Sequence, residues 1–142
     1  MITYARRFLA GKDLRDELLR IIAEEKIQAG FILACVGSLS KGTLRMAGAL
    51  PGKEDVRIFE EDLEVVSAEG TLSQSGIHVH LGLSRKDGTC IGGHLKSGCV
   101  IKTTMELVIG ESHDFQFSRI PDSKTGFEEL SVLNRSSAQT QF

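Results

Sequence analysis

Residues 76–95 read GIHVHLGLSRKDGTCIGGHL, and this stretch decides how we expect the chain to fold. Apolar residues alternate with small or polar residues before a central turn signal, Lys86-Asp87-Gly88, and a second apolar run follows it. Alternation with period two is typical of a strand with one buried face. Asp-Gly between two such runs is typical of a hairpin. The stretch therefore predicts two antiparallel strands, over residues 77–84 and 89–96.

Three of the four histidines of the chain lie in this hairpin, at His78, His80 and His94. Because side chains alternate along a strand, His78 and His80 share one face. The length of the turn decides where His94 lies. A three-residue loop with Gly88 in the left-handed conformation pairs His80 with His94, and their Cβ atoms then lie about 4.5–5.5 Å apart. A two-residue loop would instead turn His94 to the other face.

The three histidines form a candidate metal site. Small residues share their face, and Gly92-Gly93 precede His94, so the rings have room above them. Three neutral imidazoles with an open position are the ligand set of zinc where it activates water or polarises a carbonyl. We therefore expect zinc, or another divalent metal, at His78, His80 and His94. The alternative is that they are ordinary strand residues, hydrogen-bonded to their neighbours.

Three charged residues are candidates for chemistry beside the metal. Glu64 and Glu106 each interrupt an apolar strand segment, so each is a candidate to orient water or to move a proton. Both positions are equally compatible with the solvent-facing side of a half-exposed strand. Arg45 is a candidate to pair with an anionic substrate.

The rest of the chain predicts an α+β fold with one main N-terminal helix beside a mostly antiparallel sheet. Asp13 suits the N-cap of that helix, and Gly30 suits its C-terminal stop. Residues 31–36 form a continuous apolar run, which is typical of a strand covered on both faces. The helix buries a stripe made of Leu14, Leu18, Ile21 and Ile22. Further strands are expected at residues 3–9, 43–50, 56–59, 63–70, 99–109 and 114–120.

Length and composition indicate a single domain. Residues 1–130 are expected to form it, and residues 131–142 to form a polar tail that is frayed at its end. A formal net charge of −2 gives no support to a duplex-binding surface. We expect a cytoplasmic protein without contact with a membrane, because no apolar stretch reaches about 20 residues and no signal peptide is evident. The three cysteines are expected to be buried reduced thiols, at Cys35, Cys90 and Cys99.

Five segments, taken in order, resemble the plants-and-prokaryotes-conserved (PPC) domain family. They are GTLS (70–73), HVHLGLS (78–84), GGHLKSGCV (92–100), TTMELVI (103–109) and TGFEEL (125–130). The resemblance implies a strongly bent antiparallel sheet, a fold similar to that of acetolactate decarboxylase, and assembly as a homotrimer. It also implies that His78, His80 and His94 are metal ligands.

Two functions follow from the residues and the resemblance. One is metal-dependent chemistry on a small carbonyl or carboxylate compound. The other is a DNA-binding or regulatory module whose metal is structural or absent. Plant relatives bind DNA through a separate Arg-Gly-Arg-Pro AT-hook, which this sequence does not contain, and plant PPC domains generally lack the histidines. Both differences favour the metal-dependent role.

Overall fold

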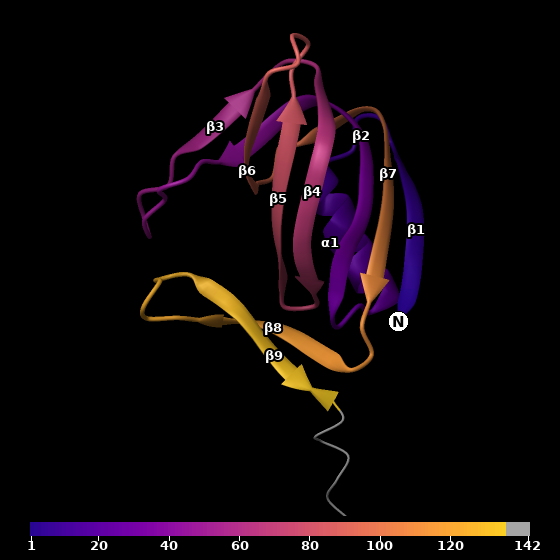
Figure 1. Cartoon of the computed structure of the whole chain (residues 1–142), viewed down its shortest axis with the longest axis vertical. Coiled ribbons are helices and arrows are strands. Elements are labelled where there is room, and N and C mark those ends of the chain that lie inside the picture. The colour runs from indigo at the N-terminus through magenta and orange to yellow at the C-terminus, as the bar shows by residue number, and fades with distance from the viewer. Residues whose placement is uncertain (136–142) are drawn as a thin grey trace, which may run out of the picture.

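Strands make up most of the computed structural model, which describes residues 1–135. Its elements follow the chain from indigo to yellow in Figure 1. They are β1 (Ile2–Leu9), α1 (Leu14–Glu25), β2 (Gly30–Arg45), β3 (Val56–Phe59), β4 (Leu63–Ser73), β5 (Gly76–Ser84), β6 (Cys90–Leu95), β7 (Val100–Glu111), β8 (Phe115–Pro121) and β9 (Glu128–Asn134).

One large antiparallel sheet forms the body of the molecule, with the strand order β1-β7-β2-β4-β5-β6 and with β3 paired to β2. The far end of β2 also pairs with β6, so the sheet bends back on itself. Helix α1 lies behind this sheet in Figure 1. Its buried residues, among them Leu18 and Ile21, belong to the same core as Leu83 and Leu107 of the sheet. The predicted α+β class, with one helix and a mostly antiparallel sheet, is confirmed.

Helix α1 begins where the sequence predicts and ends earlier. The Asp13 carboxylate accepts hydrogen bonds from the N–H groups of Arg15 and Asp16, at 2.9 and 3.2 Å, as expected of an N-cap. The helix ends at Lys26, which adopts the left-handed conformation with φ 55°. Gly30, the predicted stop, instead begins β2. There, an added Cβ would lie 2.7 Å from the Ile27 side chain, so packing explains this glycine better than capping does.

Strand β2 is continuous where the sequence predicted two strands. Its pairing with β7 shifts register three times, between Ile32 and Lys41. Such bulges bend a strand and increase its twist without ending it. They let one end of β2 pair with β7 and β4 while the other end pairs with β3 and β6. The strand stops at Arg45, so residues 46–50 lie outside it.

The apolar run at residues 31–36 is not covered on both faces, contrary to the prediction. Leu33 is 49% exposed and Val36 is 62% exposed. Both lie on the half of β2 that pairs with β7. An apolar run therefore identified the strand correctly, whereas it did not distinguish a covered face from an open one.

The hairpin β8–β9 forms a separate two-stranded sheet that crosses the lower end of the main sheet in Figure 1. It is tied to the body by backbone N–H groups. Phe117 donates to the Gln28 carbonyl at 2.9 Å, and Arg119 donates to the Ser75 hydroxyl at 2.9 Å. Strand β9 continues to Asn134, so the start of the segment predicted as a polar tail is paired with β8. The predicted fraying concerns the end of that tail, and residues 136–142 lie outside the described residues.

The three cysteines are free thiols, but they differ in environment. Cys99 is buried and Cys35 is half-buried, and burial raises the pKa of Cys35 to about 12 and that of Cys99 to about 11. Cys90 is exposed at the start of β6, so its predicted burial is wrong. Within residues 1–135, the structure contains no helix with the length and apolarity needed to cross a membrane.

Candidate metal centre

The turn between β5 and β6 has the geometry that the candidate site requires. The N–H of Arg85 donates to the Thr89 carbonyl at 2.8 Å, and the N–H of Gly88 donates to the Arg85 carbonyl at 2.9 Å. Gly88 has φ 83°, a left-handed conformation that favours glycine. The loop is therefore the predicted three-residue one, and His80 pairs directly with His94.

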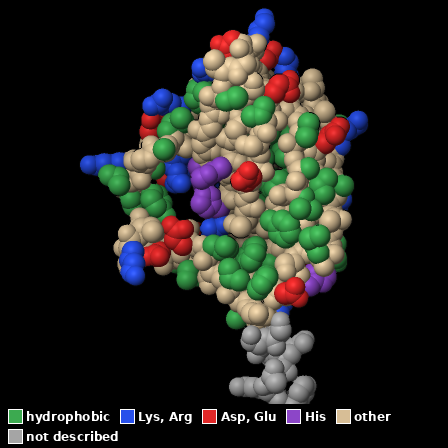
Figure 2. Space-filling view, in the orientation of Figure 1, with side chains coloured by type: hydrophobic (Ala, Val, Ile, Leu, Met, Phe, Trp, Pro, Cys, Tyr) green, Lys and Arg blue, Asp and Glu red, His purple; other side chains and the backbone are tan. Residues whose placement is uncertain are grey.

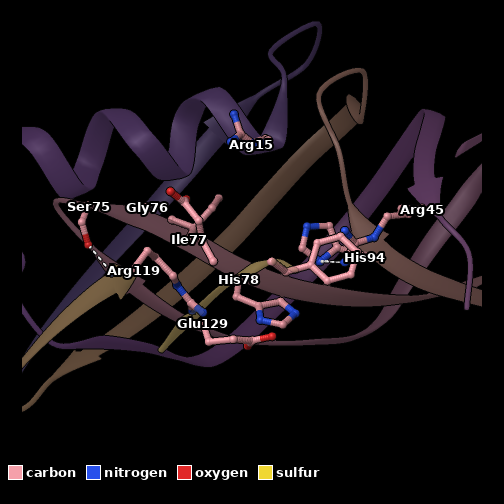
Figure 3. Close-up of a pocket in the computed structure, with 11 residues that line it drawn as sticks. Arg15, Arg45, Ser75, Gly76, Ile77, His78, His94, Arg119 and Glu129 are labelled. Atoms are coloured by element: carbon pink, nitrogen blue, oxygen red, sulfur yellow. Dashed lines mark hydrogen bonds between the residues drawn. The ribbon is translucent and has the colours of Figure 1, made fainter. Parts of the chain in front are cut away.

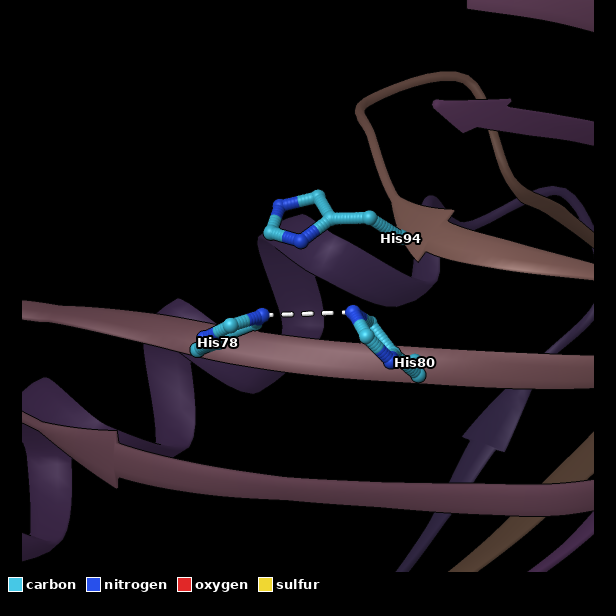
Figure 4. A group of neighbouring side chains, drawn as sticks. All are labelled: His78, His80 and His94. Carbon is cyan, nitrogen blue, oxygen red and sulfur yellow. Dashed lines mark hydrogen bonds between the residues drawn. The ribbon is translucent and has the colours of Figure 1, made fainter. Parts of the chain in front are cut away.

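The three histidines converge on one face of the sheet, as Figure 4 shows. One ring nitrogen of each residue lies within 4.8 Å of the others. The Nε2 atoms of His78 and His80 are 3.2 Å apart. On the opposite face of β5, Val79, Leu81 and Leu83 are buried in the core, which fixes the strand's orientation. The register thus turns the rings outward as a group.

The distance between His78 and His80 fits a shared metal ion. Two nitrogens at a Zn–N distance of 2.0–2.1 Å in a tetrahedron are about 3.3–3.4 Å apart, close to the 3.2 Å between His78 and His80. The same distance suits an N–H···N hydrogen bond, so this pair alone does not exclude the alternative of ordinary strand histidines. The third ring differs from this pair. Within residues 1–135 His94 makes no hydrogen bond to the other two histidines, and its Nδ1 atom instead lies 3.4 Å from Nη2 of Arg45.

Burial and neighbouring arginines keep two of the imidazoles neutral. Desolvation lowers the pKa of His94 to about 4, with further contributions from Arg45 and His78. Desolvation also lowers the pKa of His78, assisted by the positive charge of Arg119. Neutral imidazole is the form that binds a metal, so protons compete weakly for these two ligands near neutral pH.

Arg45, a candidate from the sequence, lies at this centre. It pairs with His94 across β2 and β6, and its Nη2 atom is 3.4 Å from Nδ1 of His94, a long contact for a hydrogen bond. Its Nη1 atom donates to Glu54 at 3.0 Å. The guanidinium carbon also lies 5.0 Å from the centre of the Phe127 ring. Arg45 is therefore already paired with a carboxylate and covered by an aromatic ring.

The structure does not bring Glu64 or Glu106 to the histidines. Glu64 is exposed and pairs with Ser84, four residues along β5 from His80, or about 13 Å. Glu106 is also exposed and lies on β7, which β2 and β4 separate from β5.

The acidic residue opposite His80 in the strand pairing is Glu69 of β4. It lines a shallow hollow of about 260 Å³ together with His78 and His80. Glu69 is not among the residues predicted from the sequence, because its position depends on the register of β4 with β5 and not on a pattern at Glu69 itself. The two-residue turn Gln74-Ser75 pairs Ser73 with Gly76 and so sets Glu69 opposite His80.

A larger open pocket adjoins the histidines on the side of the β8–β9 hairpin. Figure 2 shows the hollow, with a group of histidine side chains on its wall. It measures about 420 Å³ and is lined by His78 and His94, a size within the usual range of small-molecule sites. Figure 3 shows the Arg119 side chain extending from β8 toward His78 and Glu129. A second hollow of about 380 Å³ lies beyond Arg45 and Phe127.

With this geometry in place, comparison with known families identifies the fold. The model of the Plants and Prokaryotes Conserved (PCC) domain, also written PPC, matches residues 1–113. The chain belongs to this family. The match spans β1 to β7 of this PPC protein and therefore includes all three histidines. The hairpin β8–β9 begins after the matched residues.

Similar proteins extend over nearly the whole PPC chain. It is 43% identical over 129 residues to the bifunctional protein GlmU of Synechococcus sp. (strain JA-3-3Ab), covering 91% of this chain and 20% of that protein. The chain thus spans about a fifth of the length of the curated relatives it matches.

Solved structures share the PPC fold. A hypothetical protein from Salmonella cholerae-suis is 37% identical, with a TM-score of 0.88 and coverage of 94% of each chain. A metal-containing protein from Archaeoglobus fulgidus is 24% identical, with a TM-score of 0.79 and coverage of 92% of this chain and 94% of that one. The second likeness shows the fold alone.

Proposed function

We propose that this PPC protein binds a zinc ion, or another divalent metal, through His78, His80 and His94 and uses it in chemistry on a small carbonyl or carboxylate compound. The observation that carries the proposal is the convergence of three imidazole nitrogens within 4.8 Å on one outward face. The Archaeoglobus protein, which has the same fold and is described as metal-containing, supports it.

The residues around the histidines suit such chemistry. A bound zinc ion would supply a Lewis acid that polarises a carbonyl or lowers the pKa of water. Glu69 pairs with His80, so we assign the role of moving a proton to Glu69 rather than to Glu64 or Glu106. Arg45 lies beside His94, and a guanidinium can only donate hydrogen bonds. We therefore assign it the role of a positive charge that disfavours protonation of that ring. The adjoining pocket of about 420 Å³ would hold the compound.

Metal analysis of the purified protein tests the site. We expect about one zinc per chain by mass spectrometry after expression in zinc-supplemented medium. The variant His80→Ala removes one of three ligands and should lose most of the metal. His113→Ala is the matched control, because His113 is exposed outside the cluster. A folded His80→Ala protein with the zinc content of the wild type would contradict the proposal.

The alternative function, DNA binding by a PPC module, has a different signature. The formal net charge of −2 does not favour it. A protein that held no metal, and whose affinity for duplex DNA fell steeply with salt, would support this alternative. A zinc-loaded protein without affinity for duplex DNA would support the metal-dependent role.

We also propose that the protein assembles as a homotrimer in the cytoplasm. The half-exposed apolar side chains of Leu33 and Val36 on β2 are candidates for burial between copies. The free thiol of exposed Cys90 suits a reducing compartment.

A further inference from the structure

One cation beside the histidines has unused hydrogen-bonding capacity. The Nη2 atom of Arg119 donates to the Thr71 hydroxyl, which is neutral. Its Nε atom is buried and has no hydrogen-bond partner. Across residues 1–135, no aspartate or glutamate oxygen forms an ion pair with this guanidinium. The hydrogen bond to Thr71 is the one that this side chain donates within residues 1–135, and a guanidinium carries five N–H groups. The N–H groups of Nη1 and the second N–H of Nη2 are therefore available to an additional acceptor.

Arg119 is held in place by backbone contacts rather than by its own charge. Its N–H donates to the hydroxyl of Ser75, in the turn between β4 and β5, at 2.9 Å. Two residues earlier, the N–H of Phe117 donates to the Gln28 carbonyl. Strand pairing with Leu130 completes the hairpin. The guanidinium is therefore presented to the pocket from a backbone that is fixed on both sides.

Three arginines line the pocket, Arg15, Arg45 and Arg119. The charges that act on His78 are those of Arg119 and Arg45, and of these two Arg45 is already paired with a carboxylate. Arg45 donates to Glu54 and lies over Phe127. Glu128 and Glu129 of β9 line the same pocket, but neither forms an ion pair with Arg119. Figure 3 shows the guanidinium of Arg119 near His78, with the Glu129 carboxylate beside it.

We propose that Arg119 binds a carboxylate of the small molecule that the metal centre receives, so that the ligand class is a small carboxylate with a second oxygen donor. This inference rests on the proposed function, because the second oxygen would face the three histidines. A guanidinium can hold a carboxylate with two parallel hydrogen bonds, which a neutral amide of the same shape cannot match. Glu129 competes with the ligand for the same cation.

Malonate and its neutral counterpart malonamide are suitable probes, measured by calorimetry on the zinc-loaded protein. We expect malonate to bind at least about tenfold more tightly than malonamide. Arg119→Gln should weaken malonate about tenfold or more and leave malonamide unchanged. Glu129→Gln should tighten malonate a few-fold, because it removes the competing carboxylate. Lys124→Gln, which removes an equal charge from the exposed hairpin loop, should have no effect.

Equal affinities for malonate and malonamide in the wild type would overturn this inference, as would a folded Arg119→Gln variant that binds malonate like the wild type. Should Arg119→Gln fail to fold, Glu129→Gln carries the test, and unchanged malonate affinity in that variant would count against it. Zinc content is measured on every sample. A wild type without zinc contradicts the proposed function only, because a titration of the metal-free protein still reports whether malonate binding depends on Arg119.

Discussion

Two side chains of the histidine cluster are kept neutral by their surroundings. His94 is half-buried and has two cationic neighbours, Arg45 and Lys96, so its protonated form is disfavoured. The protonated form of His78 is disfavoured by burial and by the positive charge of Arg119, which lower its pKa. These environments cost the protein stability in acid, and they also prepare the rings to bind a metal near neutral pH.

The metal-free protein should therefore lose stability on acidification. His94 has a pKa of about 4 when folded and 6.5 in its ordinary state, so the unfolded chain binds more protons between these values. Stability is fully present above about pH 6.5 and falls as the pH drops toward 4. NMR titration of the chelator-treated protein should place the His94 ring near pH 4. Urea unfolding should show that the free energy of unfolding changes less between pH 7 and pH 5 in His94→Gln than in the wild type. A His94 titration near 6.5 would contradict the assigned environment.

Among the elements, the β5–β6 hairpin does most to build the centre. Its loop sets the pairing of His80 with His94, and Gly93 lets β6 approach β2 closely. An added Cβ at Gly93 would lie 2.7 Å from the Arg45 carbonyl oxygen. The histidine cluster is thus a consequence of backbone geometry in two places, the turn and the β2–β6 contact.

A substitution in the turn tests this dependence. Gly88 has φ 83° and open space around an added Cβ, so Gly88→Ala should destabilise the fold by about 1–2 kcal/mol through backbone strain alone. It should also weaken zinc binding, because the strain acts on the loop that sets the histidine register. Gly11→Ala is the matched control, with φ 81°, open space and a position away from the centre. We expect urea unfolding to give a similar decrease in the free energy of unfolding for both variants. A chelator competition should show weaker zinc binding only for Gly88→Ala. Equal zinc affinities would show that the turn does not control the site.

For the molecule as a whole, sequence reasoning succeeded where interactions are local. The turn at Gly88 and the alternation around His78 specified the hairpin, since both signals lie within the segment they control. It failed where distant segments meet. The bulges of β2 arise from its pairing with β7, and Arg119 reaches the pocket only because the β8–β9 hairpin crosses the sheet. No local sequence pattern around Arg119 predicts that its side chain lines the pocket.

At the scale of the whole molecule, the exposed apolar side chains on the outer surface bear on how copies of the chain assemble. If the chain forms a trimer through β2, light scattering should give three times the 15.5 kDa mass of one chain. Val36 is 62% exposed in the single chain, so Val36→Lys would place a charge in the interface and should yield a monomer, because burying an unpaired ammonium is costly. Ile58→Lys is the control, since Ile58 is 58% exposed on β3, and it should leave the mass unchanged. A wild type with the mass of a single chain would contradict the trimer. It would not contradict the proposed metal site, because all three histidines belong to one chain.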